Sequence, residues 1–389
     1  MDCIYCEKEI NKKSKEHIIQ SALGSNLKSV NLLCEDCNNY FARNESGKID
    51  DVFVEQFKEF RNILNIWGDR KTPPPTLRNV SIVDGVPLHL APGGHPIFAK
   101  SIREEEISPD GKLTIKVQSP NIVKAKEQIT HMKKQYENSG MTIEDASLNK
   151  LYVMQHLKFS TKLGGELVSK GVLKNLYGFL FYLMRDKLIS LQLKPIDFTA
   201  LRNYLRYKVA TDEVKANIDY TNELPFVLDS KDVSNYIFIF GSKSSEIIWG
   251  FLVVLGHFQY SGILNKNYIG EDFGFGIKQN PENRVLNFFD NVAPISYNSD
   301  VTMNYPKYAK NYFKIMETKV SEIINYYFEK SNDGNISNIT SEAINSVLKE
   351  GDIITKGKIN QFARIVAENF TNYQFKIPSS QNIDEDELL

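Results

Sequence analysis

The chain contains four cysteines, arranged as two Cys-x-x-Cys pairs, Cys3/Cys6 and Cys34/Cys37. Each pair can place two thiolates on one metal ion, and two pairs complete a tetrahedral zinc site of the closed, structural type. This cysteine pattern favours free, metal-binding thiols in a reducing compartment over disulfide bonds. We therefore expect a structural Zn2+ bound by all four cysteines.

The segment between the two pairs carries further residues that could do chemistry. Glu16 and His17 open a short apolar strand over 16–20, and residues 31–33 are expected to form the returning strand. A helix is expected from Asn38 onward. A fold of about 50 residues rarely buries enough apolar surface to be stable alone, so a zinc ion at its base is physically sensible.

This pattern of Cys-x-x-Cys, Glu16-His17-Ile18, Asn31 and Cys-x-x-Cys-Asn38 resembles the HNH, or ββα-metal, endonucleases in their zinc-stapled form. The resemblance covers about 50 of the 389 residues. It implies that His17 is the general base that takes a proton from the water attacking a phosphodiester, a task suited to a neutral imidazole. It also implies that Asn31 orients the imidazole, and that Glu16 and Asn38 bind a catalytic divalent ion.

The catalytic ion implied by the resemblance is Mg2+ or Mn2+. Asn38 stands where many members of the family have His, and an amide oxygen favours these harder ions. The adjacent Asn39 could exchange roles with Asn38. Gln20 replaces the usual Pro, which we expect to affect only the loop shape, and Asp50 and Asp51 are expected to be a solvated helix end rather than further ligands.

The rest of the chain predicts an α+β fold in three parts. We expect an HNH-type zinc module with its docking helix over 1–68, a larger mixed α+β region over 76–378 and an acidic tail over 379–389. Apolar periodicity predicts the following elements: a helix over 50–67, a small antiparallel sheet over 76–117, helices over 121–138 and 147–190 (two), a hairpin over 235–263 and helices over 306–374. The run Pro73–Pro75 is expected to be a stiff linker.

Charge is unevenly distributed. Residues 121–211 contain 15 Lys+Arg and 7 Asp+Glu, although the whole chain has a net charge of −1. Such a surplus would bind the phosphates of DNA, but it would equally solvate exposed helix faces, and both interpretations stay open. The remaining histidines have no ligand partner at a suitable spacing and are expected to be ordinary surface or packing residues: His89, His95, His131, His156 and His257.

The longest apolar run, Leu176–Met184, is about half the length that a membrane span needs, and we see no signal peptide, so we expect a cytoplasmic protein. The function implied by the resemblance is metal-dependent hydrolysis of phosphodiester bonds in DNA, in restriction or anti-phage defence, with residues 76–378 selecting or sensing the target. A nucleotide or phage-derived activator and a homo-oligomer are left open. The alternative is a non-catalytic zinc-knuckle protein that binds nucleic acid or a partner.

Overall fold

A computed structural model describes most of the chain. The described residues are 1–43, 48–83, 85–120, 122–140, 147–149, 161–191, 193, 195–207, 209, 211, 213–219, 224, 229, 231–293, 295, 297, 305–348, 352–374 and 380–382. Both helices and sheets are present, which confirms the α+β class. No helix among these residues is long and apolar enough to cross a membrane.

The chain divides into two compact units. The first consists of Met1–Pro75 and Ser160–Tyr326, and the second of Thr76–Phe159 and Tyr327–Leu389. The N-terminal module thus shares the first unit with residues 160–326, whereas residues 76–159 belong to the second. Of the expected tail 379–389, the described part is Ser380–Asn382.

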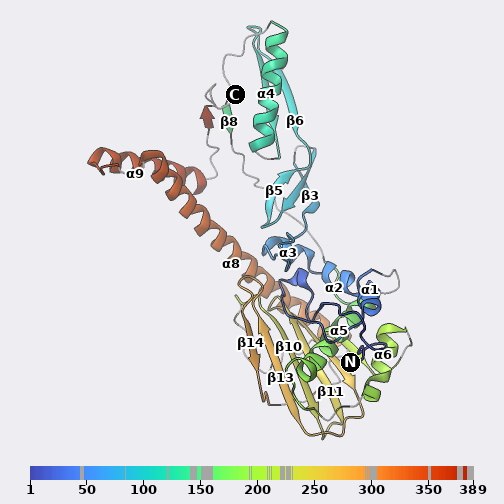
Figure 1. The fold of residues 1–389 in the computed structure, drawn as a ribbon. Coiled ribbons are helices and arrows are strands. Elements are labelled where there is room, and N and C mark those ends of the chain that lie inside the picture. Colours follow the sequence, from blue (N-terminus) through green and yellow to red (C-terminus); the bar gives the residue numbers. More distant parts are fainter. Residues whose placement is uncertain are drawn as a thin grey trace. The chain divides into compact units, whose positions relative to one another are not determined.

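The first unit is built on a six-stranded antiparallel sheet (Figure 1). Its strand order is β14-β13-β10-β11-β12-β9. The strands are β9 Lys215–Ile218, β10 Asn235–Ser242, β11 Ile247–Val254, β12 Phe258–Asn265, β13 Phe273–Gln279 and β14 Leu286–Phe289. A hairpin was expected over 235–263. β10 and β11 form one, with its turn at 243–246, but residues 247–265 form two strands, so a third strand, β12, follows.

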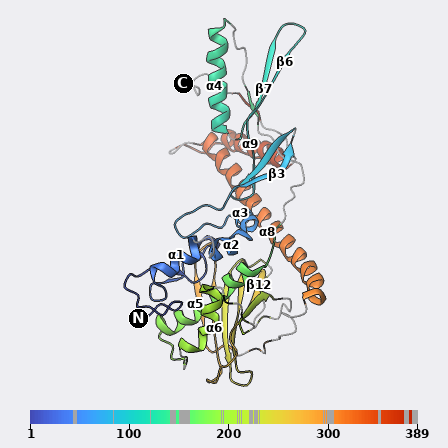
Figure 2. The same ribbon diagram turned by 90° about the vertical axis from the view of Figure 1, so that its right-hand side faces the viewer.

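One face of this sheet is covered by helix α5, Glu166–Arg185 (Figure 2). The helix follows Gly164 and Gly165, whose φ values of 85° and 100° permit the sharp entry. It is apolar almost all round and buried from residue 170 to 183, as expected of a helix enclosed on several sides. Two helices were expected over 147–190. Among the described residues, that range holds α5 and the short strand β8, Ser147–Asn149.

The opposite face of the sheet carries an aromatic cluster. Alternate residues of β10 and β11 point to this side, as strand geometry requires. The first unit also contains the first part of helix α8, Tyr305–Val347. In this part Tyr312, Met316 and Ile323 are buried. The cluster consists of Tyr236, Phe238, Phe240, Trp249, Phe251, Val253 and Ile263.

The N-terminal module lies on α5. It contains β1 Glu16–His17, β2 Lys28–Ser29, α1 Glu35–Arg43, α2 Ile49–Glu55 and α3 Lys58–Ile63. The returning strand lies at 28–29, so its expected position at 31–33 is wrong: Leu32 and Leu33 are fully buried in a loop instead. The helix expected over 50–67 is broken between α2 and α3 and ends at Ile63.

The second unit contains the expected small antiparallel strands and the helix at 122–138. β3 Leu77–Val83, β4 Val86–Ala91 and β5 His95–Phe98 form one sheet, and β6 Ile102–Ile107 pairs with β7 Leu113–Gln118. The unit also includes α4 Ile122–Asn138, the rest of α8, α9 Lys356–Gln374, and a pair formed by β8 and β15 Ser380–Asn382. His156 lies outside the described residues.

Close packing of α2 against α5 yields a first prediction. A Cβ at Gly171 would lie 2.9 Å from three side-chain atoms of Phe53, whereas a Cβ at Gly178 would have its nearest contact at 3.9 Å, with Ile18. Gly171→Ala should therefore be less stable than Gly178→Ala by about 1–3 kcal/mol, a typical cost of overpacking. The gain in helix propensity from replacing glycine by alanine is the same in both variants, because both residues lie inside α5.

The measurement is urea unfolding followed by tryptophan fluorescence. Both tryptophans, Trp67 and Trp249, belong to the first unit, so the signal reports this unit. Equal stability of the two variants would contradict the tight packing of α2 on α5.

Candidate functional site

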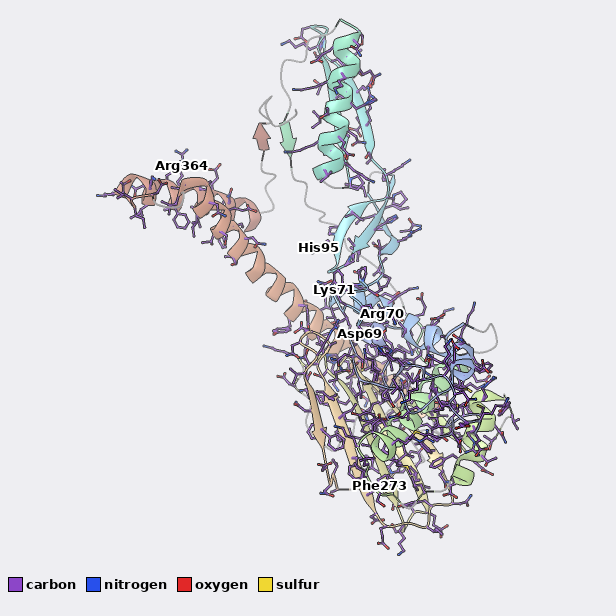
Figure 3. All side chains as sticks on the ribbon, viewed as in Figure 1. Asp69, Arg70, Lys71, His95, Phe273 and Arg364 are labelled. Carbon is purple, nitrogen blue, oxygen red and sulfur yellow. The ribbon has the colours of Figure 1, made fainter. Side chains whose placement is uncertain are left out.

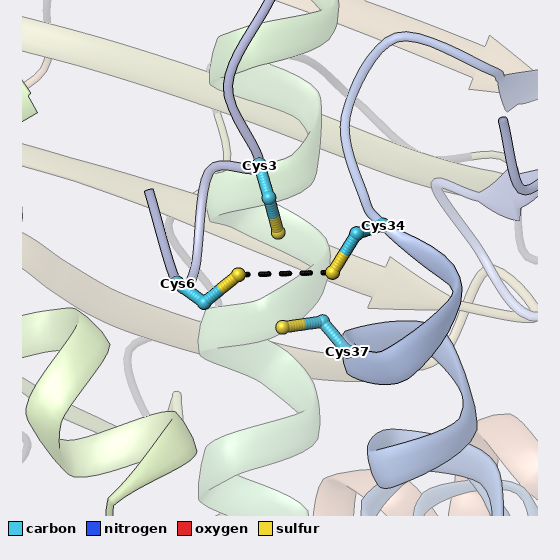
Figure 4. Close-up of side chains that lie close together, drawn as sticks. All are labelled: Cys3, Cys6, Cys34 and Cys37. Atoms are coloured by element: carbon cyan, nitrogen blue, oxygen red, sulfur yellow. Dashed lines mark hydrogen bonds between the residues drawn. The ribbon is translucent and has the colours of Figure 1, made fainter. Parts of the chain in front are cut away.

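The four cysteine side chains converge at the base of the N-terminal module (Figure 4). Their sulfur atoms all lie within 4.8 Å of one another, and the Sγ atoms of Cys6 and Cys34 are 3.7 Å apart. A tetrahedral zinc site with bonds of about 2.3 Å requires sulfur separations of about 3.8 Å. The cysteines form no disulfide, and their geometry fits one Zn2+.

Backbone hydrogen bonds shape the two turns that carry these cysteines. Cys3 and Cys6 lie in a tight turn in which the Glu7 N–H donates to the Cys3 carbonyl at 2.9 Å. Cys34 and Cys37 lie at the start of α1, where the Asn38 N–H donates to the Cys34 carbonyl at 3.1 Å. A hydrogen bond from the Cys37 thiol lowers the pKa of Cys3, which favours the thiolate form that a metal ligand requires.

β1 places Glu16 and His17 on opposite sides. Glu16 pairs with Ser29 and His17 with Lys28, and successive residues of a strand point to opposite faces. Glu16 is accordingly buried, whereas the His17 side chain is 24% exposed. The two residues expected to act together are therefore adjacent in sequence but face different surroundings.

His17 contacts Asp69. Asp69 belongs to the segment that follows α3, where Figure 3 labels it beside Arg70 and Lys71. Nε2 of His17 lies 3.4 Å from Oδ2 of Asp69, and Lys28 Nζ donates to the same oxygen at 3.0 Å. Burial lowers the pKa of His17 below its ordinary value, although Asp69 acts in the opposite direction. The imidazole is therefore neutral at pH 7, the state that a general base requires.

Glu16 contacts the ammonium group of Lys174, which projects from α5. Lys174 Nζ also lies 2.9 and 3.0 Å from the two carboxylate oxygens of Asp50 in α2. Burial raises the pKa of Glu16 to about 7, against the opposing effect of Lys174. Burial lowers the pKa of Lys174, but Asp50 and Glu16 together raise it above its ordinary value. The three groups form a buried ion cluster.

Two expectations about this neighbourhood are wrong. Asp50 is not a solvated helix end, because its side chain is 18% exposed and bonded to Lys174, whereas Asp51 is exposed as expected. Gln20 does more than shape a loop: its amide donates to Asp50 Oδ1 at 2.8 Å and exchanges hydrogen bonds of 3.0 and 3.1 Å with Asn175 of α5.

The two expected asparagines take different partners. Asn31 donates to Asp186 Oδ1 at 2.9 Å, and its carbonyl accepts a hydrogen bond from Arg185, so it joins the loop to the end of α5. Asn38 donates to Ser14 Oγ at 2.7 Å. Asn39 is exposed. Among the described residues, the cysteines are the one group of three or more His, Cys, Asp or Glu side chains arranged to hold a metal.

The fold of this module, with its paired strands, helix and four-cysteine cluster, can be compared with known proteins. Residues 3–58 match the HNH endonuclease family. We refer to residues 3–58 as the HNH region. Searches of curated proteins and of solved structures gave no match.

Three site residues were missed by sequence reasoning. Lys174 offered a signal, because a cation within an apolar helix is seldom buried without an ionic partner. Asp69 lies just outside the HNH region and Arg284, which contacts it, lies 215 positions further along the chain. No spacing pattern could have joined them.

The basic surplus over 121–211 proves to be partly internal. Lys170 is buried and paired with Glu166, and Lys174 belongs to the ion cluster. Three arginines also bond within the first unit: Arg185 to the Asn31 carbonyl, Arg202 to Glu7, and Arg206 over the ring of Tyr40. For these five cations, a structural role is therefore favoured over an exposed DNA-binding face.

The zinc geometry predicts one Zn2+ per chain, measurable by elemental analysis of the purified protein. Cys34→Ser should lose the ion and unfold the HNH region, because a structural zinc site supplies folding free energy. His17→Ala should keep the ion, because His17 is no zinc ligand. Zinc retention by Cys34→Ser, or zinc loss in His17→Ala, would contradict this assignment.

The ion cluster predicts that Lys174→Met is strongly destabilising. Removing the ammonium leaves two carboxylates without their buried partner, a change that typically costs about 3–5 kcal/mol. Lys243→Met is the matched control, because Lys243 pairs with Glu271 on the surface and such pairs contribute about 0–1 kcal/mol. Urea unfolding by tryptophan fluorescence measures both, and similar stabilities would refute a buried cluster.

Proposed function

We propose that the protein is an endonuclease that hydrolyses phosphodiester bonds in DNA, with His17 as the general base. The observation that carries this proposal is a partly exposed imidazole in contact with Asp69, within a region that matches the HNH endonucleases. The zinc-binding cysteines hold the framework and take no part in the chemistry. Asn31 supports the loop that carries the paired strands through its contacts with α5.

His17 would take a proton from the attacking water. Its side chain reaches solvent, and its lowered pKa keeps it in the proton-accepting form at pH 7. General bases of this kind contribute roughly 10²–10⁴-fold to a rate. Loss of His17 should therefore abolish most of the activity without loss of the fold.

The residues that could bind a catalytic divalent ion are Glu16 and Asn38. Mg2+ or Mn2+, when bound at such a site, stabilises charge on the phosphate and the leaving oxygen. The ammonium of Lys174 contacts Oε1 of Glu16, so a divalent ion bound by Glu16 would compete with Lys174. Asn38 keeps an amide oxygen that could serve as a ligand. We therefore expect cleavage to depend on a divalent ion, which Asn38 would help to bind.

The setting in restriction or anti-phage defence is likewise proposed. A small cutting region joined to a larger one suits target selection or sensing, and a nucleotide or phage-derived activator and a homo-oligomer belong to the same proposal. One observation favours the alternative, a non-catalytic zinc protein that binds nucleic acid: the expected metal ligand Glu16 is neutralised by Lys174.

The test is the conversion of supercoiled plasmid to nicked and linear forms, with Mg2+, with Mn2+ and with EDTA. We expect wild type to cut in the presence of a divalent ion and His17→Ala to be inactive. Lys12→Ala is the control, because Lys12 forms an exposed ion pair with Glu35. If wild type stays inactive on phage DNA and with added nucleotides, the non-catalytic alternative replaces the nuclease.

A further inference from the structure

Asp69 is surrounded by three basic side chains from distant parts of the first unit. Its Oδ2 lies 3.0 Å from Lys28 Nζ and 3.4 Å from His17 Nε2, and its Oδ1 lies 3.5 Å from Arg284 Nη1. The Asp69 side chain is 17% exposed. Both carboxylate oxygens are therefore contacted: Oδ2 by Lys28 and the imidazole of His17, and Oδ1 by Arg284.

Arg284 also holds the backbone on which Asp69 is carried. Its two terminal nitrogens donate to the Gly68 carbonyl at 2.9 Å and to the Asp69 carbonyl at 3.2 Å. Arg284 lies in the turn between β13 and β14 with φ of 62°, and its N–H donates to the Asn280 carbonyl at 2.9 Å. The sheet thus supports the segment that contacts the candidate base.

The position of the carboxylate has a chemical consequence for the imidazole. An ionised carboxylate only accepts hydrogen bonds, and a neutral imidazole has one N–H and one free lone pair. Facing Asp69, Nε2 must carry the proton, which leaves the lone pair on Nδ1. Lys28 lowers the pKa of Asp69, so the carboxylate is ionised at neutral pH.

We propose that Asp69 is a positioning residue that holds His17 in the Nε2–H form, so that Nδ1 is the atom that accepts the proton, and that Arg284 keeps Asp69 in place. This rests on the proposed nuclease function. A water O–H gives its proton to Nδ1, the water oxygen forms the new bond to phosphorus, and the bond to the leaving oxygen breaks with its electron pair on that oxygen. The resulting imidazolium stays beside the Asp69 carboxylate.

The first experiment measures the tautomer directly and needs no activity. In protein with 15N-labelled histidine, the His17 signals are assigned as those that disappear in His17→Ala, since the chain has six histidines. Wild type at a pH where His17 is neutral should show one protonated and one unprotonated nitrogen, well separated, with Nε2 protonated. In Asp69→Ala the two resonances should move toward each other, and in Arg284→Ala they should move part of the way.

The second experiment measures cleavage kinetics. Asp69→Ala should lower kcat roughly tenfold with little change in KM, a smaller loss than the roughly 10²–10⁴-fold supplied by a general base. Asp51→Ala is the control, because Asp51 is an exposed carboxylate of α2. Asp69→Asn preserves side-chain shape if the alanine variant folds poorly, as judged by zinc content and tryptophan fluorescence.

The two experiments separate the two proposals. A wild-type His17 with mixed tautomers, or one protonated at Nδ1, overturns the role of Asp69 whether or not the protein cuts DNA. An unchanged kcat in folded Asp69→Ala also overturns it while leaving the nuclease intact. If wild type shows the Nε2–H form but no cleavage, the positioning contact stands and the proposed function fails.

Discussion

The buried ammonium of Lys174, enclosed by Glu16 and Asp50, fixes how the HNH region lies on α5. A charge removed from water is very costly unless opposite charges meet it, so this geometry tolerates little displacement. The cluster joins β1, α2 and α5 at one point. Because a strand alternates its faces, holding Glu16 inward also turns His17 outward. A contact that performs no chemistry thereby sets the direction of the candidate base.

The four-cysteine cluster and the apolar contacts with α5 hold the HNH region in place at other points. The cysteines join the N-terminal turn to α1, and Tyr5 beside them packs between the rings of Phe41 and Tyr177, at centroid distances of 4.6 and 5.4 Å. Tyr177 also donates to the Ile4 carbonyl at 3.0 Å. The HNH region therefore shares a hydrophobic core with the sheet and α5, and we expect its stability to depend on the rest of the first unit as well as on a metal held by the cysteines.

The convergence of the four cysteines could be predicted because its information is local: two short spacings define four candidate ligands. The α+β class and the helix at 122–138 followed from periodicity, which also depends on neighbours in sequence. Leu32 and Leu33 misled the strand prediction because a buried loop is as apolar as a strand. The contact between Asp69 and Arg284 had no local signal, since it exists only when the sheet folds.

The internal pairing of basic side chains also makes a count of charges along the sequence a poor guide to DNA binding. Affinity from counterion release requires cations that reach phosphates, and a cation already bonded within the protein contributes little. Lys170 and Lys174 are buried, and Arg202 is bonded to Glu7. A surplus counted along the sequence therefore overstates the charge available to a duplex. Near the candidate base, Lys28 and Arg284 are partly exposed, at 38% and 31%, but both are held by Asp69. Both contact the carboxylate that faces His17, and any contact with a phosphate would compete with that pairing.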